Sequence, residues 1–127
     1  MRNTRKNENG QSLVEFALVL PVLLLLVVGI FEFGRAWMTK NIVTGAAREA
    51  VRVLAVELGG GPAAAASRAD NVLKSGKITK YDIEVDPASA YNPVSVKITT
   101  NFQVLNGLIP GLDNIELSST TTMRREY

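Results

Sequence analysis

The sequence contains no cysteine and no histidine. It therefore forms no disulfide, has no thiolate nucleophile and lacks the usual zinc ligands. It also has no glycine-flanked nucleophilic serine, and no pair of carboxylates stands out from the background. Catalysis has no support in such a sequence, so we expect a protein that is not an enzyme, holds no metal and needs no cofactor.

Net charge is also missing beyond the first ten residues. The formal charge of +2 is accounted for by Arg2, Arg5 and Lys6 against Glu8, and the rest of the chain is neutral. No later segment gathers lysine or arginine with aromatic residues, so we expect no nucleic-acid partner. A short basic tail ahead of an apolar run is instead typical of the cytoplasmic side of a membrane protein.

The apolar run extends from Leu13 to Phe31, and Glu15 is its only charged residue. Nineteen helical residues reach roughly 28 Å, close to the ~30 Å thickness of the hydrocarbon core. A carboxylate near one end of such a span costs ~2–3 kcal/mol or more unless a cation pairs with it. The sequence therefore predicts a membrane-spanning helix whose Glu15 needs a cation, and that cation can belong to another chain.

Periodicity and composition divide the chain into four parts. Residues 1–10 are predicted to be a disordered leader, residues 11–34 a transmembrane helix that opens at Gln11 or Ser12, residues 35–58 its extracytoplasmic, amphipathic continuation, and residues 59–127 a small head. Trp37 lies where an interfacial aromatic residue is expected. Pro21 removes a backbone donor and is expected to bend the membrane half.

In the head, helical and then alternating patterns follow the glycines at 59–61. Pro62 favours the start of a second helix over Ala63–Ser75, with Gly76 as its stop. Three alternating sets then predict strands: Ile83 and Val85; Val94, Val96, Ile98, Thr100, Phe102 and Val104; Ile115, Leu117, Ser119, Thr121 and Met123. The predicted fold class is α+β: a long N-terminal helix, one short helix, and an antiparallel sheet of about three strands packed on a helix.

The segment Gly10-Gln11-Ser12-Leu13-Val14-Glu15-Phe16 resembles the processing site of a type IV prepilin. The resemblance implies that a prepilin peptidase cuts between Gly10 and Gln11, which makes Glu15 the fifth residue of the mature protein. It also implies that Glu15 pairs with the new amino group of a neighbouring subunit during assembly. Gln11 departs from the pattern, since many pilins begin the mature chain with an apolar residue.

The resemblance is most specific over residues 10–52. Three segments there, together with the C-terminal segment Leu117–Glu126, look like the TadE family of the tight-adherence (Tad/Flp) pilus system: Glu15–Leu24, Phe31–Ala36 and Ala46–Arg52. Membership implies an inner-membrane pseudopilin accessory to a pilus or secretion machine. The basic tail predicts a cytoplasmic N-terminus and an extracytoplasmic head, and we expect Pro21 and Gly29 to adjust the packing of the helix with other pilins. The expected partners of the chain are a prepilin peptidase, other pilins, Tad membrane components and the lipid bilayer.

Other interpretations of the apolar run stay open. It can be a generic anchor with one stray glutamate, or a secretory signal peptide, although it is longer than the 7–15 apolar residues typical of one. Beyond the pilin hypothesis, the chain can be a single-pass, membrane-tethered binding module outside the cytoplasm that is not processed as a pilin. An enzyme on a membrane stalk is disfavoured by the missing histidine and cysteine.

Three further groups of residues have alternative interpretations. The first, Arg48, Glu49 and Arg52, is either a solvated face with a local ion pair or an assembly contact. The second, Asp82, Glu84 and Asp86, is either a solvated strand face or a set of calcium ligands. The third, residues 118–122, is either a glycosylated run or a half-exposed strand.

Overall fold

The computed structural model describes residues 5–56, 61–87, 93–107, 111 and 114–124. The chain divides into two compact units, Met1–Gly34 and Arg35–Tyr127. The boundary between them falls within the first helix.

Helix α1 extends over Arg5–Val56 and continues through Pro21. The predicted disordered leader is wrong for residues 5–10, because α1 begins six residues ahead of Gln11. The poorest helix former in that stretch is Gly10, which costs about 1 kcal/mol relative to alanine. That cost does not end a helix whose hydrogen bonds continue on both sides. The predicted helix end at Leu58 and most of the 59–61 linker lie outside the described residues.

The described part of the first unit is a helix that is mostly apolar from Leu13 to Phe31 and exposed there. Every residue from Gly10 to Phe31 is exposed, including leucines, valines and phenylalanines. Within the described residues, α1 is the one helix long and apolar enough to cross a membrane, with a mean hydropathy of 2.8 in its most apolar stretch. The chain is thus consistent with a single-pass membrane protein.

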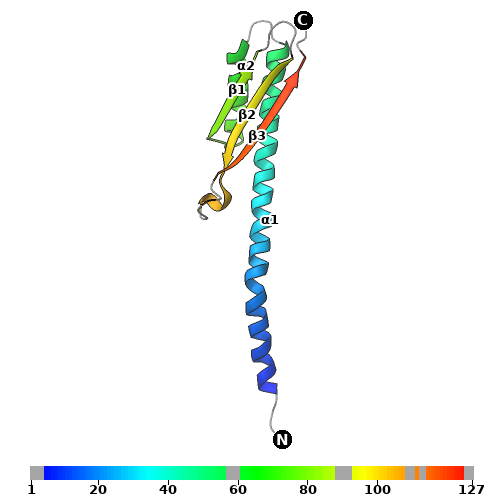
Figure 1. Ribbon diagram of the computed structural model, residues 1–127, viewed down its shortest axis with the longest axis vertical. Helices are drawn as coiled ribbons and strands as arrows, with labels where there is room; N and C mark the ends of the chain where they lie inside the picture. Colours follow the sequence, from blue (N-terminus) through cyan, green and yellow to red (C-terminus); the bar gives the residue numbers. More distant parts are fainter. Residues whose placement is uncertain (1–4, 57–60, 88–92, 108–110, 112–113, 125–127) are drawn as a thin grey trace. The chain divides into compact units, whose positions relative to one another are not determined.

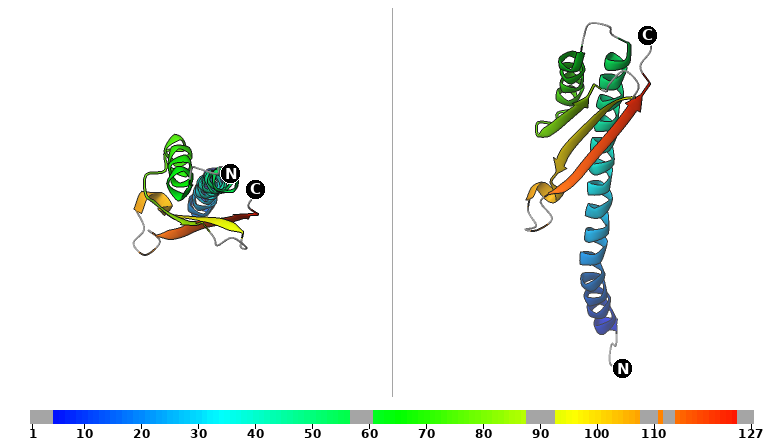
Figure 2. Two further views of the ribbon diagram at one scale, coloured as in Figure 1. Left: turned by 90° about the horizontal axis from the view of Figure 1, so that it is seen from above. Right: turned by 45° about the horizontal axis from the view of Figure 1, so that its top comes forward.

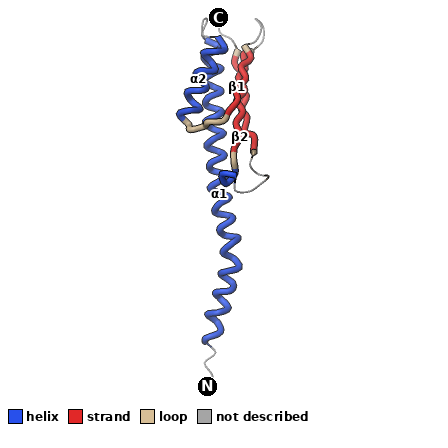
Figure 3. The backbone as a smooth tube through the Cα atoms, turned by 90° about the vertical axis from the view of Figure 1, so that its left-hand side faces the viewer, coloured by secondary structure: helices blue, strands red, loops and turns tan. Residues whose placement is uncertain are grey.

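The second unit is a two-layer α+β head, as predicted. Residues 35–56 of α1 and the short helix α2 (Gly61–Ser75) form one layer. The other layer is a sheet of three antiparallel strands in the order β1-β2-β3 (Figure 1), formed by Tyr81–Asp86, Val94–Phe102 and Ile115–Met123. Both helices lie on the same face of the sheet (Figures 2 and 3).

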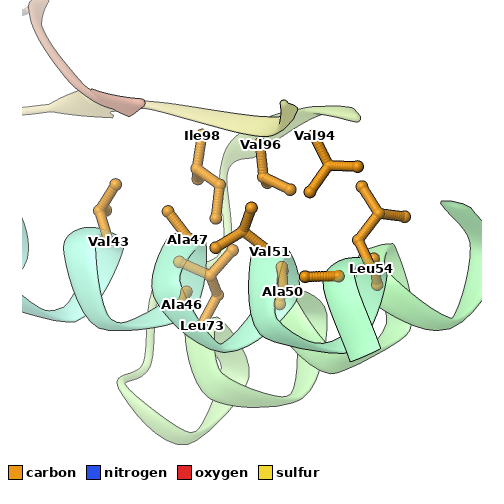
Figure 4. Packing of buried hydrophobic residues seen from close by; sticks show 13 residues of the cluster. Val43, Ala46, Ala47, Ala50, Val51, Leu54, Leu73, Val94, Val96 and Ile98 are labelled. Carbon is orange, nitrogen blue, oxygen red and sulfur yellow. The ribbon is translucent and has the colours of Figure 1, made fainter. Parts of the chain in front are cut away.

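The core lies where the sheet meets the two helices. The central strand β2 alternates as the sequence predicts, with Val94, Val96 and Ile98 buried against α1 (Figure 4). The helices contribute mostly small residues to the core, among them Ala46, Ala47, Ala50, Ala65 and Ala69. Leu73 is the one large side chain of α2 that is fully buried. Each buried valine, leucine or isoleucine stabilises the fold by about 1.5–3 kcal/mol relative to exposure.

The strand register assigns the apolar and polar sets to opposite faces. Ile83 pairs with Ile98, and Ile98 pairs with Ser119, so these three lie on the helix-facing side. Edge strand β3 is only half-buried, which agrees with the half-exposed interpretation of residues 118–122. One predicted strand residue is misplaced, because β2 ends at Phe102 and Val104 belongs to a 3-10 helix, η1 (Val104–Gly107). The apolar period alone did not reveal where the strand stops.

Helix α2 ends at Ser75 through three backbone hydrogen bonds. Gly76 N–H donates to the Val72 carbonyl, Lys77 N–H to that of Lys74, and Ile78 N–H to that of Leu73, each at 3.0 Å. Lys77, not Gly76, adopts the left-handed conformation (φ 60°) that usually belongs to glycine in this motif. Gly76 is needed for another reason: a Cβ there would lie 2.6 Å from Ile42 Cγ2 of α1.

Candidate functional site

The first part of the candidate site is Glu15, one helical turn after Gln11. Gln11 Nε2 donates to Glu15 Oε1 at 3.4 Å, and both side chains are exposed. This distance is long for a hydrogen bond, so the contact is weak. None of the salt bridges among the described residues involves Glu15. Glu15 is therefore a carboxylate on an exposed apolar helix, and no described cation forms a salt bridge with it.

The other predicted site residues lie on the same helix and are equally exposed. A Cβ added at Gly10 or at Gly29 would meet no atom within 4 Å. Pro21 lies between them, inside the helix. Within the described part of the first unit, the surface around these residues is apolar and exposed. The structure does not bring the predicted site residues into a pocket.

The charged residues Arg48, Glu49 and Arg52 do not form the local ion pair that their spacing predicts, because Glu49 pairs with another helix. Glu49 Oε2 pairs across the two helices with Arg68 Nε of α2 at 3.6 Å. Both side chains are about half exposed, so this pair contributes only about 0–1 kcal/mol. Arg48 and Arg52 are exposed beside it. The proposed assembly contact there stays a prediction.

The acidic residues of β1 do not gather into a metal site. Within the described residues, no three acidic side chains lie close enough to hold a metal ion. Glu84 instead pairs with its cross-strand neighbour Lys97 at 3.5 Å. Asp82, Glu84 and Asp86 lie on the face of the sheet that the helices leave open, so this face is polar and solvated.

A polar network that the sequence analysis missed joins α2 to β1. The Tyr81 hydroxyl donates to Asp70 Oδ1, and Lys74 Nζ donates to Asp70 Oδ2 at 2.6 Å. The hydrogen bond from Lys74, followed by that from Tyr81, lowers the pKa of Asp70. The hydrogen bond to Asp70 raises the pKa of both Lys74 and Tyr81. The i,i+4 spacing of Asp70 and Lys74 signals half of this network, whereas no local pattern signals Tyr81.

Two more long-range contacts bind α1 to the sheet. Lys40 Nζ donates to the backbone carbonyl of Ser118 in β3. The Arg35 guanidinium lies over the Phe102 ring, 5.3 Å from its centre, which is within cation–π range. Arg35 also lines an open groove of about 400 Å³ in the head. Its walls come from residues 35–42 of α1, residues 76–80 after α2, residues 100–103 at the end of β2, and Asn114.

A comparison with protein families gives one match. Residues 10–52 match the family described as TadE-like protein. This match agrees with the resemblance stated from the sequence over those residues, and it supports a Tad pilus-associated protein. The C-terminal resemblance at residues 117–126 lies outside the match and stays a prediction. No curated protein and no solved structure matches the chain.

Proposed function

Since this chain is TadE-like over residues 10–52, we propose that it is a pseudopilin of the Tad/Flp system. A prepilin peptidase removes residues 1–10 by cutting between Gly10 and Gln11. The mature helix then packs with those of other pilins or Tad membrane components as a pilus or secretion apparatus assembles. The chain performs no catalytic step of its own in this process.

The observation that carries the proposal is the position of Glu15. It lies on a helix whose surface is exposed from Gly10 to Phe31, and Gln11 is its described hydrogen-bonding neighbour. A carboxylate in lipid is costly unless it is paired, and breaking a buried ion pair costs about 3–5 kcal/mol. If a second chain supplies a cation at the depth of Glu15 in the membrane, the ion pair would therefore fix the axial register between the two helices.

Cleavage would create that cation. Cutting after Gly10 converts the Gln11 amide nitrogen into an amino group, which is positively charged at neutral pH. The new amino end lies one helical turn before Glu15. The side chains of Gln11 and Glu15 are already in contact, with Gln11 Nε2 3.4 Å from Glu15 Oε1. When two mature helices lie side by side in parallel, the amino end of one chain can reach Glu15 of the other with a small axial shift.

The proposal places the N-terminus in the cytoplasm and the head outside it. The basic residues Arg2, Arg5 and Lys6 precede the span, as the positive-inside rule requires. The head then presents two surfaces to partners: the polar face of the sheet and the exposed arginines of α1. In this arrangement the processed chain stays in the inner membrane until it is incorporated into the assembly.

The experiment is an intact-mass measurement of the full chain after co-expression with a prepilin peptidase. We expect the mass to fall by that of residues 1–10, and Gly10→Ala to keep the full mass. Gly34→Ala is the matched control, because added Cβ atoms at both glycines meet nothing within 4 Å. The two variants therefore differ in the peptidase site and not in packing. A chain that retains Met1 beside an active peptidase would contradict the proposal and favour the membrane-tethered binding module.

A further inference from the structure

The groove in the head has a distinctive charge. Three of its lining residues are cationic, namely Arg35, Lys77 and Lys80, and none of its described lining residues is acidic. No salt bridge among the described residues involves Lys77 or Lys80. Both lysines are exposed and line the groove, so their positive charges are accessible to a ligand there.

Part of the lining of the groove is apolar. Met38 and Ile42 of α1, Ile78 after α2, and Phe102 of β2 contribute to the lining. The Arg35 guanidinium lies on the Phe102 ring, so a cationic group and an aromatic surface occupy the same wall. A volume of about 400 Å³ is within the range of small-molecule sites, ~300–1,000 Å³. The ligand that fits combines an anionic group with an apolar portion.

The first wall of the groove follows the apolar run in the sequence. Arg35 directly follows the last residue of the first unit, Gly34. Around it, Phe31, Phe33 and Trp37 are all more than half exposed. Exposed aromatic residues at the end of an apolar span are typical of the headgroup level of a membrane. Residues 35–42, which form the first wall of the groove, thus lie next in the sequence to the residues expected at headgroup level.

Lys77 has an additional feature. It adopts φ 60°, a conformation that favours glycine, yet the chain has a lysine there. Non-glycine residues in this region persist where the surrounding structure holds them, and they occur preferentially at ligand-binding positions. The backbone of Lys77 is fixed by the hydrogen bond from its N–H to the Lys74 carbonyl at 3.0 Å. One of the three cations is thus attached to a well-defined backbone position.

We propose that this groove binds the headgroup of an anionic phospholipid. The three cations contact the phosphate and any further negative charge, and the upper part of the acyl chains or the glycerol lies against the apolar part of the lining, Met38, Ile42 and Ile78. Basic pockets of membrane proteins bind anionic headgroups by the same combination of charges. A free phosphate would satisfy the cations but would leave the apolar lining residues uncovered.

The test uses the absence of cysteine from the chain, because one substitution then provides a single labelling site. Thr79→Cys lies on the groove wall, and Thr120→Cys lies on the open face of the sheet as a control. Each full-length chain is labelled with bimane and reconstituted in phosphatidylcholine vesicles. Either nitroxide-labelled phosphatidylglycerol or nitroxide-labelled phosphatidylcholine is added as the quencher, at the same mole fraction.

We expect phosphatidylglycerol to quench the label at residue 79 more strongly than phosphatidylcholine does. Each cation near an anionic surface contributes about five-fold to binding, so each single neutralisation should reduce the preference by roughly that factor. Arg35→Gln, Lys77→Gln and Lys80→Gln together should abolish it. Lys97→Gln removes an exposed lysine of the opposite face and should leave it unchanged. The label at residue 120 should show no preference.

Three outcomes would overturn the proposal. The first is equal quenching by the two lipids in the otherwise unaltered chain. The second is a preference that survives the triple neutralisation while circular dichroism shows the fold intact. The third is loss of the preference in inorganic phosphate but not in sodium chloride of the same ionic strength, which would assign the groove to a free anion. The proposal does not rest on cleavage, so Gly10→Ala should give the same quenching.

Discussion

Gly76 follows the end of α2, and Ile42 lies in α1. The two residues meet so closely that a Cβ on Gly76 would lie 2.6 Å from Ile42 Cγ2. The segment after α2 is thereby pressed against α1 at the edge of the groove. The absence of a side chain at residue 76 is therefore a tertiary requirement, and not a requirement of the helix end itself.

Replacing this glycine should destabilise the head. Gly76→Ala forces Ile42 or the backbone to move, and overpacking of this kind costs about 1–3 kcal/mol. Denaturant unfolding of the full chain in detergent measures the loss. Gly45→Ala is the control, because its Cβ meets nothing within 4 Å and helical alanine is favoured over glycine by about 0.5–1 kcal/mol. The cost of Gly76→Ala should shrink in an Ile42→Ala background, and an undiminished cost would contradict the contact.

The neighbouring residue should behave in the opposite way. Lys77 has φ 60°, so Lys77→Gly relieves the left-handed strain and should stabilise the chain by up to about 1 kcal/mol. Lys80→Gly removes an exposed lysine that is not among the positive-φ residues and should not stabilise the fold. Unfolding midpoints of the two variants make the comparison. A destabilised Lys77→Gly chain would show that the lysine side chain contributes more to the fold than its backbone strain costs.

Removing the main side chain of α2 should loosen its attachment. Leu73 is fully buried, and a buried Leu→Ala substitution costs about 2–5 kcal/mol. Val72→Ala should reduce the free energy of unfolding clearly less, because Val72 is only partly buried. Hydrogen exchange of α2 amides reports where the stability is lost. Equal losses of stability in Leu73→Ala and Val72→Ala would mean that the attachment of α2 does not depend on its buried side chains.

The network of Asp70, Lys74 and Tyr81 predicts that its contribution to the free energy of unfolding is constant near neutral pH and decreases in both acid and alkali. The pKa of Asp70 is lowered, so its contribution is complete above the ordinary carboxyl pKa of 3.8 and is lost as pH falls through the lowered value. The pKa values of Tyr81 and Lys74 are raised. Their contributions are complete below 10.0 and 10.5, respectively, and are lost as pH rises through the raised values.

Unfolding of the Asp70→Asn chain across the pH range tests both the decrease of stability in acid and the decrease in alkali. The variant should be less stable at neutral pH and should lose the contribution of this network to the acid and the alkaline slopes. Asp82→Asn, on the open side of β1, is the control for removing one carboxylate. If Asp70→Asn keeps the alkaline slope of the unaltered chain, Tyr81 and Lys74 do not depend on Asp70.

Glu15 should affect assembly and not membrane insertion. Glu15→Ala makes the span more apolar, so the chain should remain in the membrane fraction but fail to associate with other pilins. Glu15→Gln keeps the shape and should fail in the same way, whereas Glu15→Asp keeps the charge and should retain part of the assembly. Fractionation followed by cross-linking gives the readout. Normal assembly of the Glu15→Gln chain would remove the ion pair from the proposed mechanism.

Much of the fold was predictable because its signals are local. Alternation in β2 places Val94, Val96 and Ile98 on one face whatever else the chain does, and the structure confirms it. The helix start was not predictable in this way. Arg5–Gly10 has no apolar period of its own, and it is helical because nothing within it stops the helix that follows.

The candidate site divides along the same line. Glu15 stands out in the sequence because one charge in an apolar run is costly wherever the run is placed. Tyr81, by contrast, shows no local sign of its bond to Asp70, because eleven residues and a change from helix to strand separate them. The groove is further still from local prediction, since its cations come from α1 and from the segment after α2.

The sequence by itself determined the apolar span, its single carboxylate, the order of helices and strands, and which side of each strand is apolar. These depend on hydropathy and on the fixed periods of helix and strand, which act over a few residues. Only the tertiary structure decided which helix faces meet, why Gly76 has no side chain, and that Arg35, Lys77 and Lys80 surround one groove. Those relations depend on distances between segments far apart in the chain, and packing sets such distances.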